Sequence, residues 1–240
     1  MIKVEKIDPW GFEHAIRGMR NPMNSWDKSD SFRCKEIPDC DMCLCNGGDE
    51  VCNSPVEPED VVVGFHDLAL MQKLYKSGTE HRKYLRQIFV SMDITAPLYW
   101  WKEFDTYKIG TVANSCSTMH KIHAKEFAVE DFSTEHLETL ARFDEDGEMH
   151  KPYMVLKVVI DCLNACRNSY LQTKNKTDWW QMIQLLPSSY NQKRTVTMNY
   201  ENVVTIIRQR TGHKLDEWNE FVEILKNLPY VGEIIDGSET

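Results

Sequence analysis

Between Ala96 and Lys121 the chain changes from a cluster of aromatic rings to a run of small polar residues, and this stretch strongly constrains the fold. The rings follow Pro97 closely: Tyr99, Trp100, Trp101, Phe104 and Tyr107. Small polar side chains come next: Thr111, Asn114, Ser115, Ser117 and Thr118. Rings with polar rims followed by such a loop suit a pocket for a flat polar ligand. The alternative is a tryptophan-rich core segment followed by a solvated turn.

The charge balance narrows the class of partner. The 240 residues include 28 Lys and Arg against 37 Asp and Glu, and 42% are hydrophobic, which is typical of a globular protein. A net charge of −9 opposes non-specific nucleic-acid binding, so we expect no nucleic-acid partner. Basic residues still cluster locally, around Arg82, Lys193 and Arg210. Such clusters suit a small phosphorylated ligand or, alternatively, are solvated helix faces.

The chain carries no pattern typical of a membrane protein or a secreted one. Its first ten residues hold charges throughout and no apolar core. No apolar run approaches the roughly 18 residues of a membrane span. We therefore expect a cytoplasmic protein with no membrane contact, whose eight cysteines are mostly reduced thiols.

Hydrophobic periodicity predicts the α+β class, with mixed helices and a few strands. Strands are expected over residues 1–7, 88–94 and 194–198. The first helix is expected to start at Asp8 and Pro9 and to run to about Arg20. Further helices are expected over 66–76, 152–172, 178–186, 199–210 and 215–228, and a capped one over 133–141. Cys162 and Cys166 are expected to pack in the core as small hydrophobes.

From Asn21 to about Val61 the periodicity is lost, and this irregular segment contains five of the eight cysteines. They are Cys34, Cys40, Cys43, Cys45 and Cys52. The C-x2-C-x-C core with Cys52 could hold zinc through thiolates. The spacing lacks the second C-x2-C pair of a typical zinc site, and free surface thiols are the alternative.

The order of these elements resembles that of the flavin-dependent thymidylate synthases. Members of that family have a strand ending in Ala-Pro, as at Ala96, followed by a signature loop and a long helix. A Leu-Pro-x-x-x-Tyr motif then matches 186–190, a strand ends in Asn199, and the next helix ends in Arg210. The resemblance covers residues 1–20 and 64–228. It implies one domain over 1–240 with that family's fold, a small central sheet among mixed helices, and a Cys-rich insertion at about 30–60.

Several positions of the family signature differ in this chain. Lys102-Glu103-Phe104 stands where the family has Arg-Gln-Trp, and Thr106-Tyr107-Lys108 stands for Arg-His-Arg. The arginine that closes the signature is Met119, and the one three residues before Leu-Pro is Ile183. Neither side chain replaces the bidentate fork that binds phosphate. The candidate replacement cations are Arg82, Lys83, Arg86, Lys193 and Arg194.

The resemblance implies an enzyme that binds FAD and a pyrimidine nucleotide such as dUMP, and that methylates C5 of the uracil. Methylene-tetrahydrofolate and NADPH would be co-substrates, and the assembly would be a homotetramer. Because flavin would carry the chemistry, no protein nucleophile is required.

The resemblance also implies roles for individual residues. The flavin would be contacted by Lys108, Asn114 and Asn199, and the substrate by Glu103, Ser117, Arg194 and Arg210. Two alternatives remain: an inactive nucleotide- or flavin-binding protein of the same fold, or a metal-linked interaction protein that uses Cys40, Cys43, Cys45 and Cys52.

Overall fold

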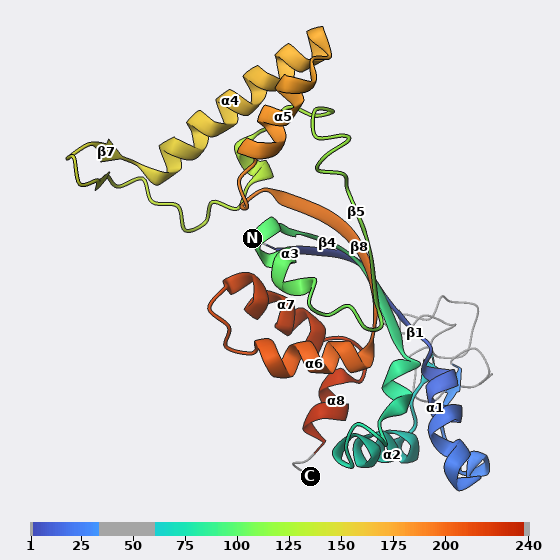
Figure 1. Ribbon diagram of the computed structural model, residues 1–240. Helices are drawn as coiled ribbons and strands as arrows, with labels where there is room; N and C mark the ends of the chain where they lie inside the picture. Colours follow the sequence, from blue (N-terminus) through green and yellow to red (C-terminus); the bar gives the residue numbers. More distant parts are fainter. Residues whose placement is uncertain (1, 34–60, 238–240) are drawn as a thin grey trace, which may run out of the picture. The chain divides into compact units, whose positions relative to one another are not determined.

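The computed structural model describes residues 2–33 and 61–237. Its main sheet has the strand order β1 (Lys3–Trp10), β4 (Phe89–Pro97), β8 (Asn191–Asn199) and β5 (Thr111–Ser115) (Figure 1). Every second residue of β4 is buried, from Val90 to Ala96, as expected for a strand with one face on the core. The predicted α+β class is confirmed.

The described residues fall into two compact units, and β1, β4 and β8 each contribute to both. The first unit contains the residues up to Ile7, Ser91–Thr197 and Arg210–Phe221. The second contains the described residues of Asp8–Val90, then Met198–Gln209, and the chain from Val222. The single domain over 1–240 and the insertion at about 30–60 stay predictions, because residues 34–60 lie outside the described part.

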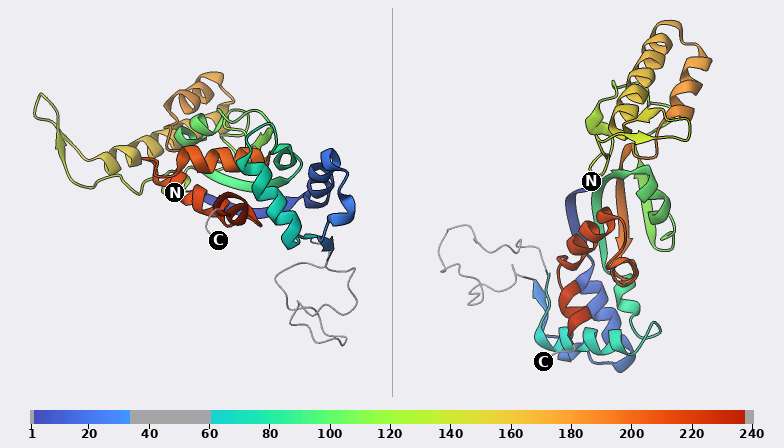
Figure 2. Two further views of the ribbon diagram at one scale, coloured as in Figure 1. Left: turned by 90° about the horizontal axis from the view of Figure 1, so that it is seen from below. Right: turned by 90° about the vertical axis from the view of Figure 1, so that its left-hand side faces the viewer.

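The first unit has two apolar clusters. Helices α4 (Pro152–Thr173) and α5 (Lys176–Leu185) run side by side in both sets of views (Figures 1 and 2). One cluster lies against this pair: Ile122, Phe127, Phe132, Leu156, Ile160, Leu163 and Met182. The other cluster joins α3 (Leu98–Phe104) to the start of α7 (Asp216–Lys226) through Trp100, Trp101, Phe104, Trp218 and Phe221. The rings at 100, 101 and 104 are therefore core residues.

The second unit is mainly helical and includes α1 (Phe12–Arg20), α2 (Phe65–Lys76), α6 (Tyr200–Arg210) except its last residue, and α8 (Val231–Asp236). Helices α2 and α8 lie against each other, and the Gln72 side chain donates to the Glu233 carbonyl at 3.0 Å. Phe12 packs edge-on against the rings of Tyr200 and Tyr230. Two short strands, β2 (Phe32–Arg33) and β3 (Val61–Val62), pair antiparallel.

Two predicted helical features are wrong. Strand β1 continues through Asp8 and Pro9, so α1 starts at Phe12 after Gly11. No helix covers 133–141. This segment is irregular, and β6 (Arg142–Phe143) and β7 (Met149–His150) follow it. The Ser133 hydroxyl donates to the Asn191 side chain, and the Ser133 N–H donates to the Ser189 carbonyl. These long-range bonds hold Ser133 beside the start of β8 (Asn191–Asn199) and not at the start of a helix.

One of the two helix cysteines departs from expectation. Cys162 is exposed, whereas Cys166 is half-buried and packs against the α4–α5 cluster, as expected. The buried positions of α4 are Leu156, Ile160 and Leu163, spaced so that they share one helix face. That face packs on α5, which leaves Cys162 on the solvent side. None of the helices in the described part is long and apolar enough to cross a membrane.

We expect Gly11→Ala to lower the free energy of unfolding by roughly 2 kcal/mol or more. Gly11 has φ +96°, and an added Cβ would lie 2.2 Å from the backbone oxygen of Gln87. The matched control is Gly78→Ala, because Gly78 has φ +104° and nothing within 4 Å of its Cβ position. Urea denaturation of both variants separates the clash from the left-handed backbone. Equal losses would contradict the role of the Gln87 contact.

Candidate functional site

Arg210, the last residue of α6, lies at the centre of a cluster of polar and aromatic side chains. Its Nη1 donates to Glu103 Oε2 at 2.5 Å, and its Nε donates to the Tyr107 hydroxyl at 2.9 Å. The guanidinium lies 4.5 Å from the centroid of the Trp218 ring, and Trp218 Nε1 donates to the same Glu103 oxygen at 3.0 Å. We call Glu103, Tyr107, Arg210, His213 and Trp218 the Arg210 cluster.

His213 completes the cluster from the loop before α7. Its Nε2 lies 3.2 Å from Arg210 Nη1 and 3.5 Å from Glu103 Oε2. The Leu215 N–H donates to His213 Nδ1 at 3.1 Å, which assigns the proton of the neutral ring to Nε2. The Glu103 carboxylate therefore faces three N–H groups, those of Arg210, Trp218 and His213. The Trp218 ring covers one face of the guanidinium.

Arg194 on β8 is held in a similar way. Its Nη1 donates to Asp105 Oδ1 at 2.7 Å, its Nε donates to Gln192 Oε1 at 3.0 Å, and its guanidinium lies 4.1 Å above the Trp101 ring. A cation over a tryptophan face is attracted by the ring electrons, and here the side chain is only 15% exposed. Each of the two predicted substrate arginines is thus paired with a carboxylate from residues 103–105.

Three of the other candidate cations, Arg82, Arg86 and Lys193, are also paired with carboxylates. No ion pair is described for Lys83. Lys193 Nζ lies 3.0 Å from Asp93 Oδ2, and the Nε atoms of Arg82 and Arg86 lie 3.0 and 3.1 Å from the two oxygens of Glu201. The Thr195 hydroxyl and the Lys193 ammonium lower the pKa of the Asp93 carboxyl. A phosphate that used Lys193, Arg82 or Arg86 would have to compete with a carboxylate already in place.

The predicted residues of the signature loop lie on an accessible surface. Asn114 is exposed on β5, and Lys108 is exposed in the turn that precedes it. Ser117 is exposed just beyond β5, where its Oγ accepts from the backbone N–H groups of Met119 and His120. That bonding is ordinary turn chemistry and leaves the Ser117 hydroxyl proton available to a ligand.

Asn199, the predicted flavin contact, is the N-cap of α6. Its Oδ1 accepts from the Asn202 N–H at 3.0 Å, as a cap does, and its amide group remains a donor. Asn199 belongs to the second unit, whereas the other residues predicted to contact flavin or substrate belong to the first.

Asn199→Ala is expected to lower the free energy of unfolding by about 1 kcal/mol, because α6 loses its cap. Asn199→Ser keeps a capping oxygen and is expected to leave stability nearly unchanged, while it removes the amide. If Asn199 contacts flavin, the Ser variant retains less FAD than the parent protein after gel filtration. Equal FAD retention at equal stability would leave Asn199 with the capping role alone.

The predicted zinc ligands Cys40, Cys43, Cys45 and Cys52 lie outside the described residues. Within the described ranges, no group of three or more His, Cys, Asp or Glu side chains is arranged to hold a metal ion. A zinc site in the Cys-rich segment therefore stays a prediction.

The structure brings together some residues that the sequence singled out and adds others that it did not. Glu103 and Arg210, both predicted to contact substrate, are in direct contact. The partners that sequence reasoning missed are Asp105, Gln192, His213 and Trp218. Asp105 could have been found from the sequence, because it and Glu103 are two carboxylates within the aromatic run, near the end of α3. His213 belongs to the basic cluster around Arg210, and no local pattern marked Gln192 or Trp218.

Comparison with known proteins identifies the fold. No protein-family model and no curated protein sequence matches the chain. Its structure is similar to Thymidylate Synthase X (ThyX) from Helicobacter pylori with FAD and dUMP, with a TM-score of 0.62 and 13% identity over 100% of both chains. A second structure of that enzyme, complexed with FAD and dUMP, gives a TM-score of 0.60 and 13% identity over 97% of this chain and 99% of that one.

A third solved structure extends the comparison to a related activity. It is the UMP/dUMP methylase PolB from Streptomyces cacaoi bound with 5-Br dUMP, with a TM-score of 0.58 and 14% identity. The match covers 99% of this chain and 95% of that one. The chain therefore has the flavin-dependent thymidylate synthase fold over its whole length, and the predicted fold is confirmed.

Proposed function

We propose that this protein binds FAD and a pyrimidine nucleotide of the dUMP class, and that it methylates C5 of the uracil ring. The observation that carries the proposal is the full-length likeness to solved structures that hold FAD with dUMP or a brominated dUMP. It is supported by Asn114 and Ser117, which match positions of the family signature, and by Asn199 and Arg210, which follow in the order that the family has.

The residues present fit a flavin. The exposed ammonium of Lys108 suits a phosphate of the cofactor, and the exposed amide of Asn114 suits the hydrogen-bonding edge of the ring system. Asn199 keeps an amide donor after capping α6. When bound, FAD supplies the redox and carbon-transfer chemistry, so the protein residues bind and orient the reactants and exclude water. NADPH and methylene-tetrahydrofolate are the co-substrates that this proposal requires.

Nucleotide recognition is assigned to Glu103, Ser117, Arg194 and Arg210. The Ser117 hydroxyl is exposed and can donate to a phosphate oxygen. Arg210 and Arg194 can offer N–H donors to phosphate, but each already pairs with a carboxylate. Phosphate binding at each guanidinium therefore takes place beside a carboxylate whose negative charge opposes it, and the affinity depends on how readily Glu103 and Asp105 give way.

The same pairing favours one alternative function, a nucleotide- or flavin-binding protein without turnover. If the carboxylates of Glu103 and Asp105 hold their arginines, flavin can still bind through Lys108 and Asn114 while the nucleotide phosphate binds weakly. A metal-linked interaction protein is the other alternative, and it depends on Cys40, Cys43, Cys45 and Cys52. The proposal also includes a homotetramer located in the cytoplasm.

The first test is the visible absorption spectrum of the purified protein before and after incubation with FAD and removal of the excess. Retained flavin absorbance supports the proposed cofactor site, and a colourless protein would contradict it. The second test is tritium release from C5-labelled dUMP in the presence of FAD, NADPH and methylene-tetrahydrofolate. Release supports the methylation reaction. Bound flavin without release would favour the non-catalytic alternative.

A further inference from the structure

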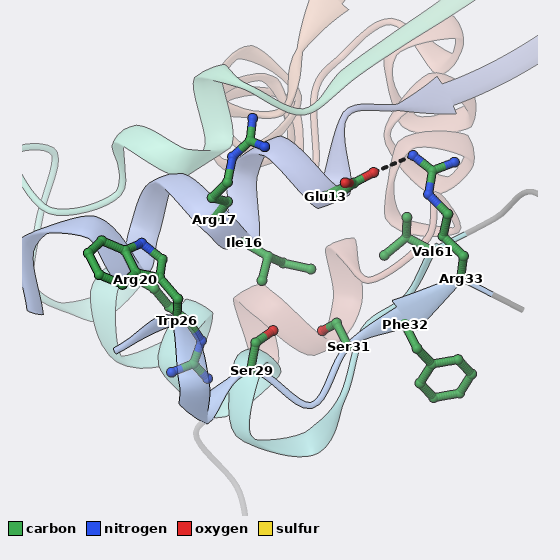
Figure 3. A pocket seen from close by; sticks show the side chains of 10 residues that line it. All are labelled: Glu13, Ile16, Arg17, Arg20, Trp26, Ser29, Ser31, Phe32, Arg33 and Val61. Atoms are coloured by element: carbon green, nitrogen blue, oxygen red, sulfur yellow. Dashed lines mark hydrogen bonds and ion pairs between the residues drawn. The ribbon is translucent and has the colours of Figure 1, made fainter. Parts of the chain in front are cut away.

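Three cations near the C-terminal end of α4 have no carboxylate partner among the described residues. They are Lys121, from the loop that follows β5, Arg167 in α4, and Lys174, the C-cap of α4. Most arginines in the described part of the chain do contact a carboxylate, and Figure 3 shows one example, the Glu13–Arg33 pair. These three cations therefore differ from the usual pattern of this protein.

The helix face that carries the core residues of α4 continues into this group. Leu163 is the last buried residue of α4. Arg167, Tyr170 and Lys174 follow it at intervals of four, three and four residues. Residues at this spacing share one face of a helix. The Lys174 ammonium lies 5.4 Å from the centroid of the Tyr170 ring, so the C-cap residue stays on the same face.

The loop that follows β5 is anchored to α4 and α5, and it passes beside them (Figure 1). Arg167 Nε donates to the His123 carbonyl at 3.0 Å, and Trp179 Nε1 donates to the Met119 carbonyl at 2.9 Å. Lys121 lies between these two anchored residues of the loop. Its backbone is therefore already held beside the helices, which lowers the entropic cost of binding a ligand.

The ring of His123 reports the electrostatics of this surface. Burial, and then the charges of Lys174, Lys121 and Arg167, lower the pKa of the ring. Every charged group that acts on His123 is thus a cation, from the loop, from α4 or from its C-cap. The negative end of a helix is equivalent to about half a unit charge, so α4 balances only part of the three positive charges.

The cations keep donors for an incoming anion. Arg167 uses Nε for the His123 carbonyl and Nη1 for Asn168 Oδ1, which leaves Nη2 with two N–H groups. Lys121 and Lys174 are exposed, and each ammonium has three N–H groups. A phosphate group brings up to about two negative charges and three strong acceptor oxygens, which suits such a set of donors better than a single carboxylate does.

We propose that Lys121, Arg167 and Lys174 bind the phosphate group of a small phosphorylated ligand. A small ligand is favoured over a nucleic acid because the chain has a net charge of −9. None of these three residues is assigned to FAD or to the nucleotide above. The site requires neither FAD nor the Arg210 cluster, so it can be tested independently of the proposed function.

The first experiment follows the His123 ring by NMR in the full chain at constant ionic strength. Its signal is identified by its loss in His123→Gln. Inorganic phosphate is expected to shift this signal in a saturable manner and to raise the pKa of His123, because a nearby anion favours the charged ring. Acetate, with one charge, is expected to bind roughly tenfold more weakly. No saturable effect of phosphate, or equal effects of phosphate and acetate, would overturn the proposal.

The source of the phosphate group is identified with dUMP and deoxyuridine. If dUMP binds more tightly than inorganic phosphate in the same NMR titration, the result supports a nucleotide as the ligand of this site. Equal affinities support another small phosphorylated compound. Deoxyuridine lacks the phosphate, so an effect on the His123 signal as strong as that of dUMP would contradict the assignment of the three cations.

Variants locate the binding at these residues. Lys121→Gln is expected to weaken phosphate binding roughly fivefold, and Arg167→Gln roughly tenfold. The matched control is Lys176→Gln, which removes the same charge from an exposed position at the start of α5 that does not act on His123. Equal phosphate affinities for the Lys121 and Lys176 variants would overturn the proposal. If Arg167→Gln does not fold, because Arg167 also anchors the loop, the exposed Lys121 decides the question.

Discussion

Glu103→Gln is expected to raise the affinity for dUMP roughly tenfold in the presence of FAD, whereas Arg210→Gln is expected to lower it roughly tenfold or more. In the parent protein the Glu103 carboxylate already occupies Nη1 of Arg210, so the nucleotide phosphate competes with a covalently tethered anion. Glutamine keeps the shape and an oxygen acceptor but removes that charge. It is also the residue that the family signature has at this position.

The opposite signs are the informative part of this prediction. If the Glu103–Arg210 pair had only a structural role, both variants would lower the melting temperature and neither would change dUMP affinity in the expected direction. Glu220→Gln is the matched control, since it removes a negative charge from an exposed position of α7 outside the Arg210 cluster. Equilibrium dialysis with labelled dUMP gives the affinities. Unchanged affinity in both site variants would contradict the assignment of Arg210 to the substrate.

Asp67→Ala is expected to lower the free energy of unfolding by about 3–5 kcal/mol, because it leaves the buried Arg20 guanidinium without its counter-ion. Asp67 is fully buried, and the Arg20 side chain is 5% exposed. The same carboxylate also accepts from the backbone N–H groups of Asp30 and Ser31, so it fixes the segment after α1 as well as the ion pair. For a chain of this size the loss corresponds to a melting temperature lower by roughly 6–20 °C.

The control for Asp67 is Ser29→Ala, which removes one donor to the carboxylate and leaves the ion pair intact. We expect Ser29→Ala to lower the free energy of unfolding by about 1 kcal/mol. Thermal unfolding followed by circular dichroism measures both variants. A loss in Asp67→Ala no larger than that in Ser29→Ala would show that the buried pair contributes little to stability.

The elements with a clear period were predictable from local sequence. Helix α2 and helix α4 lie within one residue of their expected ends, because apolar side chains recur there at helical spacing. The strand predicted over 88–94 is observed over Phe89–Pro97, and the helix predicted over 199–210 ends at Arg210 as expected. The order of these elements resembles that of the flavin-dependent thymidylate synthases. Apolar residues recur every few positions because one face of the helix or strand is buried, so this pattern can be recognised in the local sequence.

Local signals failed where a distant segment offered the backbone better partners. Asp8 and Pro9 form a good helix start in isolation, yet β1 continues through them, and α1 begins only after Gly11, which has a positive φ. Ser133 has the chemistry of a helix cap, yet it bonds to Asn191, and Phe132 forms a β-bridge with Tyr190. Pairing with a strand far along the chain outweighed a cap worth about 1 kcal/mol.

By itself the sequence determined the fold class, the main helices and the family that the chain resembles. Only the tertiary structure decided which charges meet. Arg210 pairs with Glu103 across 107 residues, and Arg20 pairs with Asp67 across 47, and no local pattern specifies either partner. The physical reason is that secondary structure follows from burial and propensity over a few neighbouring residues, whereas an ion pair depends on where packing places two distant side chains. How strongly Arg210 binds a phosphate depends on its ion pair with Glu103, and only the tertiary structure shows that pair.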